Sequence, residues 1–425
     1  MRRSSLSLVT LVLACSPHVP PPEAKREAPV VVPATPPERQ REPLPPKPTT
    51  TWTTLTVAPG CELQIADTPE ALGPPLTWTP CKGGPEGCLE TATQTEDALA
   101  PNVDLVGVSR GGKVTIAVMT MFPGPKSRYV LAPRDGLPFF ALEGLHEEQC
   151  SLGQVGMSDD GAAIEVAFDH KDGYASRAYL RGPLAADPSW REVAAVLPRR
   201  EFPQFIGASV LSVGGRVMVE QSGGPLRWYD AADKQWVEVP GSHDGWECEA
   251  SGHGDAVVFS YSSIPERPMA AKLGEPAHPL RRGPVEGTSP VMIDGDQAVW
   301  LEGSGRDRNN YYKKIDLWRA DVVAGPALAD ARHVMPVPRT TMTTPTFGGG
   351  LVVVPLAERD NGMMVVRLAT AEKLSLQPPI GLAIERVLWL TPDEVAVRIG
   401  PAEMTGEPSL LRRIPVAALP PYTEK

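Results

Sequence analysis

Several short segments of the chain combine residue types that metal sites and hydrolytic enzymes use. His146, Glu147 and Cys150 begin like a zinc-binding His-Glu-x-x-His helix, but Cys150 stands where the second histidine is needed. The residues after Cys150 have the pattern of a strand, so this segment does not place two ligands on one helical face. The polar segment 169–173 follows a predicted strand and fits a hairpin loop better than a cation site. The sequence therefore predicts no catalytic, metal-binding or cofactor-binding residue.

Two other polar segments are candidates for binding. The first gathers His243, His253 and acidic neighbours around Cys248, and ordinary loop polarity accounts for it better than a ligand site does. The second, residues 306–312, is a long polar excursion that ends in two tyrosines. Tyrosine and arginine are enriched where proteins contact one another. This loop is our first candidate for contact with a partner, through Arg306, Arg308, Asn310, Tyr311 and Tyr312, and a simple solvated loop is the alternative.

The cysteines fit an oxidising compartment. Apart from Cys15 the chain has Cys61, Cys81, Cys88, Cys150 and Cys248, so at most two disulfides form within the chain and one thiol is left over. Cys81 and Cys88 flank the turn-rich sequence Lys-Gly-Gly-Pro-Glu-Gly, which favours a bridge between them, although Cys61 could compete for either partner. A zinc site at Cys81 and Cys88 is disfavoured because their spacing lacks a Cys-x-x-Cys pair and no histidine lies near them in the sequence.

An internal repeat determines the predicted fold. Seven times, two short apolar strands flank a tight turn, and the turns begin at Gly111, Asp160, Gly214, Gly254, Gly295, Gly348 and Pro392. From Gly112 to Asp393 the average step is about 47 residues, which falls in the blade-length range of β-propellers. Some strands alternate with period two, as Ile164–Phe168 does, while others are apolar throughout, as in a sheet covered on both faces. Further strands in most units complete four antiparallel strands per repeat.

Two local resemblances support this architecture. The sequence 158–164 resembles the Ser-Pro-Asp-Gly-x-x-Ile turn of TolB-like propeller repeats, with Asp159 where proline is usual. The sequence 228–240, which contains Tyr229-Asp230 and Trp236, resembles a kelch strand pair. Each resemblance covers one unit only, so it implies a propeller fold and no family function.

We predict an all-β propeller of about seven four-stranded blades. Its units run over 101–148, 149–199, 204–241, 246–285, 288–338, 343–380 and 384–420, followed by a tail at 421–425. Residues 50–100 form N-terminal strands or a cap with the cysteine loop, and Trp52–Val57 are expected to pair with the last blade and close the ring. Eight blades, or two packed β-sandwich domains, are the structural alternatives.

The first residues have the pattern of a secretory signal peptide. Arg2 and Arg3 precede an apolar run over residues 6–14, which is shorter than the 20 or so residues that span a bilayer. The run ends in Val12-Leu13-Ala14-Cys15 and resembles the lipobox of bacterial lipoproteins, in which the cysteine that matches Cys15 is lipidated. The resemblance implies a signal peptide at 1–14 and an acyl anchor at Cys15. By resemblance to enterobacterial sorting, Ser16 favours the outer membrane, and plain secretion is the alternative.

Residues 15–49 are predicted to be a disordered stalk. Twelve prolines fall between residues 17 and 48, with hardly a large apolar side chain, so the segment cannot bury enough surface to fold. Its proline density favours polyproline II, which would hold a domain away from a membrane surface.

Charge narrows the class of partner. The formal charge is −10, and it becomes −12 when residues 1–14, with Arg2 and Arg3, are removed. Since no long basic run occurs, we predict no nucleic-acid partner. The sequence therefore predicts a cell-envelope lipoprotein whose propeller is a non-catalytic platform for a protein or glycan, either alone or as part of an envelope assembly. A propeller enzyme acting on glycans (a hydrolase, lyase or oxidoreductase) is the alternative.

Overall fold

A computed structural model of the chain describes part of it in detail. The chain divides into two units, 1–47 and 48–425, and the first unit lies outside the described residues, as does the predicted lipidation site Cys15. The described backbone covers 52–58, 61–66, 78–92, 103–108, 116–121, 126–132, 140–145, 150–158, 161–169, 175–182, 192–198, 209–214, 216–220, 225–230, 232–233, 235–242, 247–261, 267–283, 285–308, 311–322, 331–338, 342–356, 362–401 and 410–423. Side chains are described for 78–91 and for most of these residues from 211 onward.

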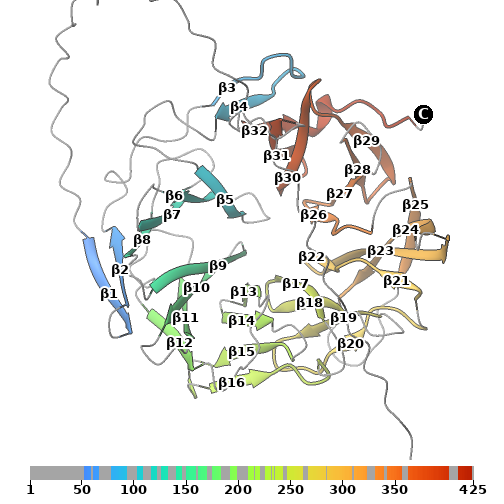
Figure 1. Cartoon of the computed structure of the whole chain (residues 1–425). Helices are drawn as coiled ribbons and strands as arrows, with labels where there is room; N and C mark the ends of the chain where they lie inside the picture. Colours follow the sequence, from blue (N-terminus) through green and yellow to red (C-terminus); the bar gives the residue numbers. More distant parts are fainter. Residues whose placement is uncertain are drawn as a thin grey trace, which may run out of the picture. The chain divides into compact units, whose positions relative to one another are not determined.

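The described strands form seven antiparallel sheets (Figure 1). The first three hold β1 (Trp52–Ala58), β2 (Cys61–Ala66), β5 (Val103–Val108), β6 (Ile116–Met121), β7 (Lys126–Ala132) and β8 (Phe140–Leu145); β9 (Cys150–Ser158), β10 (Gly161–Asp169), β11 (Ala175–Gly182) and β12 (Glu192–Pro198); and β13 (Ser209–Val213), β14 (Arg216–Glu220), β15 (Arg227–Asp230) and β16 (Gln235–Glu238). The fourth and fifth hold β17 (Glu247–His253), β18 (Ala256–Tyr261), β19 (Arg267–Lys272) and β20 (His278–Pro279); and β21 (Gly287–Thr288), β22 (Met292–Asp294), β23 (Gln297–Arg306), β24 (Tyr312–Asp321) and β25 (Arg332–Val337). The last two hold β26 (Thr346–Gly348), β27 (Leu351–Pro355), β28 (Met363–Arg367) and β29 (Glu372–Leu376); and β3 (Thr79–Pro80), β4 (Leu89–Ala92), β30 (Leu382–Leu390), β31 (Glu394–Pro401) and β32 (Leu410–Pro415), which the 3-10 turn η4 (Val416–Ala418) follows.

One strand of each sheet contacts its counterpart in the next sheet. These strands are β5, β9, β13, β17, β22, β26 and β30, and β30 also contacts β5, so the series closes on itself. Antiparallel sheets joined in such a cycle are the architecture of a β-propeller. The predicted all-β propeller class is confirmed, whereas the number of blades stays a prediction.

Strand β27 shows why some strands are apolar throughout. Leu351 and Val353 pack in the cluster that joins the sixth and seventh sheets, with Val395 and Val397 of β31. Val352 and Val354 point the other way, into the cluster that the sixth sheet shares with Leu301 and the rest of the fifth. Because successive side chains of a strand alternate between faces, a sheet covered on both sides needs apolar residues at every position.

The turns of the repeat contact one another. In sequence, each predicted turn lies between the cycle strand of a sheet and the strand that follows it. Gly214 donates its N–H to the carbonyl of Gly254 in the next turn. Asp294 Oδ1 lies 3.6 Å from His253 Nδ1, and its Oδ2 accepts the N–H of Gly349 at 2.7 Å. The turns of the third to sixth sheets are therefore linked in series.

Gly349 and Gly350 allow a matched test of this packing. Both have positive φ, +57° and +73°, but a Cβ on Gly349 would lie 2.6 Å from Pro392 N and from Thr391 C in the seventh sheet, whereas one on Gly350 would meet nothing within 4 Å. We expect Gly350→Ala to lower the free energy of unfolding by about 1–2 kcal/mol, the cost of the left-handed conformation. Gly349→Ala also forces the two turns apart and should cost about 1–3 kcal/mol more. Urea unfolding measures both, and equal losses would show that the turns do not touch.

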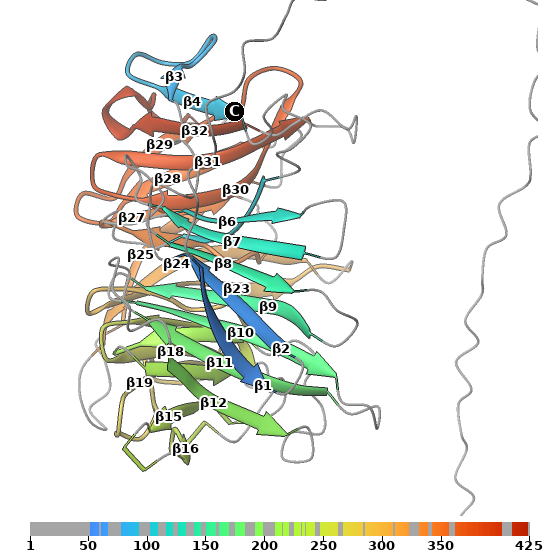
Figure 2. The same cartoon turned by 90° about the vertical axis from the view of Figure 1, so that its left-hand side faces the viewer.

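The N-terminal strands belong to the first and the last sheets in chain order: β1 and β2 to the first, β3 and β4 to the last. The expected pairing of Trp52–Val57 with the last blade is wrong: β1 pairs with β2, and β2 pairs with β8 of the first sheet, as Figure 2 shows. The strand that completes the last sheet is β4, which pairs antiparallel with β32. Closure by an N-terminal strand is thus observed, with a different strand. The short apolar run of β1 does not itself specify which sheet edge it joins.

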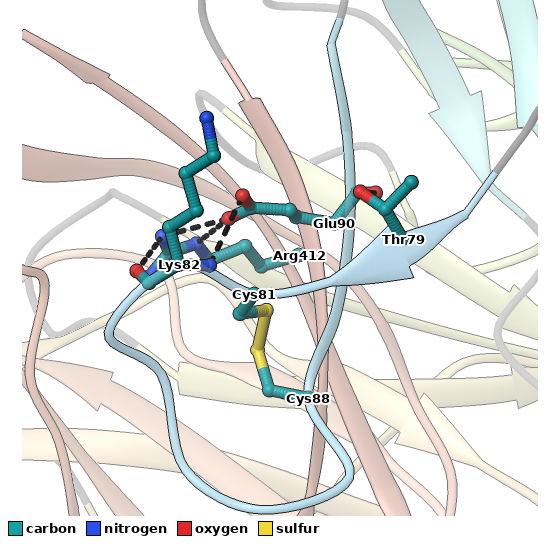
Figure 3. The surroundings of a disulfide bond; sticks show 6 residues. All are labelled: Thr79, Cys81, Lys82, Cys88, Glu90 and Arg412. Carbon is teal, nitrogen blue, oxygen red and sulfur yellow. Dashed lines mark hydrogen bonds and ion pairs between the residues drawn. A yellow bond between two sulfur atoms is a disulfide. The ribbon is translucent and has the colours of Figure 1, made fainter.

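We call residues 78–92, which contain β3 and β4, the clasp. Cys81 and Cys88 form the predicted disulfide inside it (Figure 3). Arg412 of β32 donates from Nε to Glu90 Oε2 at 3.0 Å and from Nη2 to the Lys82 carbonyl at 3.2 Å, and Glu90 Oε1 accepts the N–H of Lys82. Figure 3 shows the Arg412 and Glu90 side chains near the bridge, so Arg412 links β32 to β4 by an ion pair and to the loop after β3 by a hydrogen bond.

Candidate partner-contact site

The predicted partner loop lies at the end of a long hairpin in the fifth sheet. Strands β23 and β24 have ten residues each and pair from Gln297–Asp321 to Arg306–Tyr312. We call residues 307–311 the tip. Residues 298–303 of β23 are buried, whereas the residues from Ser304 onward are partly or fully exposed. The hairpin therefore continues beyond the core. This arrangement positions the polar loop away from the packed part of the sheet.

Tyr311 is the exposed aromatic side chain of the tip. It is 62% exposed, and among the described residues only Ile380 is another exposed large apolar side chain. Two hydrogen bonds join the ends of the tip. Asp307 donates its N–H to the Tyr311 carbonyl at 2.8 Å, and Asp307 Oδ1 accepts the Tyr311 N–H at 3.0 Å. Arg308 is exposed beside it, and Asn310 lies outside the described residues. The tip therefore presents an aromatic ring on a turn with internal hydrogen bonds.

Tyr312 has a different position from the one the sequence suggests. It is half-buried and packs at the edge of the cluster between the fifth and sixth sheets. Its hydroxyl accepts a hydrogen bond from Arg306 Nη2 and donates to the Glu286 carbonyl at 3.3 Å, while the Arg306 guanidinium lies 4.7 Å from its ring centre. Gly287 and Gly303 leave the space the ring needs, since a Cβ on either would overlap it. Of the predicted contact residues, Tyr312 and Arg306 thus support the tip.

Glu286 completes this support. Its Oε2 accepts the Gly305 N–H at 2.6 Å, and its carbonyl accepts from both Tyr312 and Arg306. The segment before β21 is therefore tied to the end of β23. Nothing in the sequence pattern identified Glu286, because the residues it contacts are 19 to 26 positions away.

Two buried carboxylates lie on the stem of the same hairpin, at the cross-strand pair Glu302 and Asp316. Glu302 forms an ion pair with Arg281 and accepts the Trp300 Nε1–H at 2.8 Å. The Arg281 guanidinium lies 4.2 Å from the Trp318 ring centre, and burial lowers the pKa of Arg281. A buried carboxylate needs such a partner, because an unpaired charge is costly away from water.

Asp316 has two basic side chains beside it, those of His333 and Lys314. His333 Nε2 lies 2.9 Å from its Oδ1, and Lys314 Nζ lies 2.8 Å from its Oδ2. Burial acts to raise the pKa of Asp316, but hydrogen bonds from Lys314 and His333 outweigh it and lower the pKa below its ordinary value. Each stem carboxylate therefore has a basic side chain as its partner. This arrangement stabilises the stem, and the lowered pKa makes the Asp316 carboxyl unsuited to donate a proton.

The other sequence candidates fall into two groups. His253 lies beside Asp294 in the linked turns described above, whereas residues 146–149, 170–174 and 243–246 lie outside the described residues. Cys61, Cys150 and Cys248 begin or lie within β2, β9 and β17, and their side chains are also outside the described set. Within that set, no group of three or more His, Cys, Asp or Glu residues could hold a metal ion. In the same part of the chain, no helix has the length and apolar character needed to cross a membrane.

Two motif spacings in the sequence begin at Gly107, near the end of β5 in the first sheet. Gly107-Val108-Ser109-Arg110-Gly111 has the Gly-x-Ser-x-Gly spacing, and Gly107 to Lys113 has the Gly-x-x-x-x-Gly-Lys spacing. A nucleophile turn and a phosphate loop each connect a strand to a helix. Here β5 pairs antiparallel with β6, the next strand in the chain, so neither motif has its required context. Residues 109–115 lie outside the described residues.

No protein family matches the chain, and no curated protein matches its sequence. Among solved structures it is similar to an oligogalacturonate lyase from Vibrio parahaemolyticus, with 13% identity, a TM-score of 0.49, and 81% of this chain and 98% of that chain covered. It is also similar to BamB from Moraxella catarrhalis (12% identity, TM-score 0.38, 78% and 90% covered) and to YCF48 bound to D1 peptide (11%, 0.42, 79% and 99%). Similarity of this degree carries no argument about function, and the fold assignment rests on the sheets of this chain.

Proposed function

We propose that this chain is a cell-envelope lipoprotein whose propeller is a non-catalytic platform for a protein or glycan partner. Lipidated Cys15 anchors it to the membrane, and residues 15–49 hold the propeller away from the surface. The pattern of residues 1–15 and the density of prolines after it support the anchor and the stalk.

The observation that carries the platform is the supported tip. An exposed tyrosine usually loses conformational entropy when it binds, and a turn that is already closed by hydrogen bonds reduces that cost. Tyr311 has such a turn, and Arg306, Tyr312 and Glu286 hold its base. A side chain of this kind is the type that forms the centre of a protein interface.

The proposal is tested by capture of partners from gently crosslinked envelopes. We expect the intact protein to recover a reproducible partner and a variant lacking residues 306–312 to lose it. Tyr311→Ala should lower recovery about tenfold or more, as loss of an interface tyrosine does, whereas Ile380→Ala, the matched exposed position, should leave recovery unchanged. Equal recovery by all forms would contradict the contact site. In the same cells, Cys15→Ser should abolish incorporation of labelled palmitate and release the protein from the membrane fraction.

A further inference from the structure

Basic side chains are exposed at the tip, at the start of β24 and in the segment before β21, in a chain that is acidic overall. Arg308 and Lys313 are exposed at the tip and at the start of β24, and Arg282 is exposed in the segment that precedes Glu286. The whole chain, by contrast, has a formal charge of −10. A local patch of the opposite sign steers an oppositely charged partner and disfavours partners of like charge.

The acidic side chains of this region form hydrogen bonds or ion pairs within the protein. Asp307 Oδ1 accepts the Tyr311 N–H, and Glu286 Oε2 accepts the Gly305 N–H. On the stem, Asp316 pairs with Lys314 and His333, and Glu302 pairs with Arg281. Since each of these carboxylates already bonds to a group of the protein, we take Arg308 and Lys313 as the charged side chains that face a partner beside Tyr311.

We infer that the tip binds an acidic segment of a protein, with Tyr311 packing on its apolar side chains and Arg308 and Lys313 facing its carboxylates. This inference rests on the proposed function and adds the chemistry of the partner. Arginine beside tyrosine is the combination enriched in protein interfaces, because the guanidinium binds a carboxylate in a bidentate geometry and the ring adds apolar contact. A glycan is the alternative occupant that the test must separate.

Charge variants test the sign of the partner's charge. In the crosslinked-envelope capture, we expect Arg308→Glu to lower recovery about fivefold and Arg308→Gln to lower it less, because the reversal adds repulsion. Arg267→Glu is the matched control, since Arg267 is an exposed cation on β19 of the fourth sheet and should have no effect. Raising the salt concentration from about 0.1 M to about 1 M should lower recovery by the unaltered protein, because screening shortens the reach of these charges.

A photoreactive phenylalanine in place of Tyr311 identifies what the tip touches. We expect a crosslinked peptide with more Asp and Glu than Lys and Arg, in a product that protease degrades and glycosidases do not. A partner lost with residues 306–312 but indifferent to Arg308→Glu and to salt would overturn this inference and leave the proposed function intact. A neutral or basic peptide, or a product that glycosidases degrade, would also overturn it. Recovery that does not depend on the tip at all would refute the proposed function itself.

Discussion

Replacement of Arg412 by methionine should lower the free energy of unfolding by about 3–5 kcal/mol, because it leaves the Glu90 carboxylate buried without its cation. The side chains of Arg412 and Glu90 are only 6% and 10% exposed, and Nη2 lies 2.8 Å from Oε2. Arg412 also donates to the Lys82 carbonyl, so the change removes a second link between β32 and the clasp. Urea unfolding followed by tryptophan fluorescence measures the loss.

A second change separates the buried charge from the packing. In Glu90→Gln/Arg412→Met the carboxylate is gone, while an amide oxygen can still accept the Lys82 N–H that Glu90 Oε1 accepts now. We expect the double variant to recover roughly half of the loss, because replacing a buried ion pair costs less than breaking it. The losses of stability in Glu90→Gln and in Arg412→Met therefore should not add up to the loss in the double variant.

A surface pair in the neighbouring sheet provides the control. Arg367 Nε lies 3.1 Å from Glu372 Oε2, but the two side chains are 34% and 51% exposed. Because water screens such pairs, Arg367→Met should cost about 1 kcal/mol or less. If Arg412→Met cost no more than this control, the clasp would not be packed against β32 as described.

The repeat made most of the fold predictable. Each turn combines Gly, Asp or Pro residues with strongly β-forming neighbours, and local sequence determines such hairpins. The apolar run of Leu351–Val354 also correctly indicated a sheet covered on both faces. These features depend on residues close together in the chain, which is why one sequence suffices to identify them.

The closing strand was less predictable. Both Trp52–Ala58 and Leu89–Ala92 form strands, and only pairing with residues more than 300 positions away distinguishes their roles. The deciding group is Arg412, one of two adjacent arginines in a strand whose other residues are apolar. A charged residue in such a strand is a signal that a distant acidic partner exists, but it does not name Glu90 as that partner.

The candidate site was also predictable only in part. Composition alone indicated the 306–312 loop, and the exposed Tyr311 is consistent with that prediction. Composition could not separate Tyr311 from Tyr312, because the two differ in what lies beside them. Tyr312 occupies space left by Gly287 and Gly303, and only the register of β21 and β23 brings those glycines together.

Loss of the Cys81–Cys88 bridge should lower the free energy of unfolding by about 2–3 kcal/mol. The two cysteines are separated by 7 positions, and closing a loop of that size removes about this much conformational free energy from the unfolded chain. Cys88 is also buried in the core cluster of the sixth and seventh sheets, with Cys81 packed against it. The double variant Cys81→Ser/Cys88→Ser therefore places two hydroxyls near apolar side chains, which adds to the loss.

A reducing agent distinguishes the bridge from the serine side chains. We expect dithiothreitol to destabilise the unaltered protein and to have no effect on Cys81→Ser/Cys88→Ser, unless a second disulfide joins other cysteines. Comparison with Cys81→Ala/Cys88→Ala isolates the cost of the hydroxyls, since alanine leaves the site apolar.

The bridge and the ion pair should act together. The disulfide holds the ends of the loop that positions the Lys82 carbonyl and N–H, and both of these groups bond to the Glu90–Arg412 pair. Arg412→Met should consequently cost less in the cysteine-free protein than in the oxidised one, with a coupling of about 0.5–3 kcal/mol between the two changes. Strict additivity would show that β4 stays on β32 without the bridge. The measured coupling thus decides whether the Cys81–Cys88 disulfide only stiffens its own loop or also stabilises the pairing of β4 with β32.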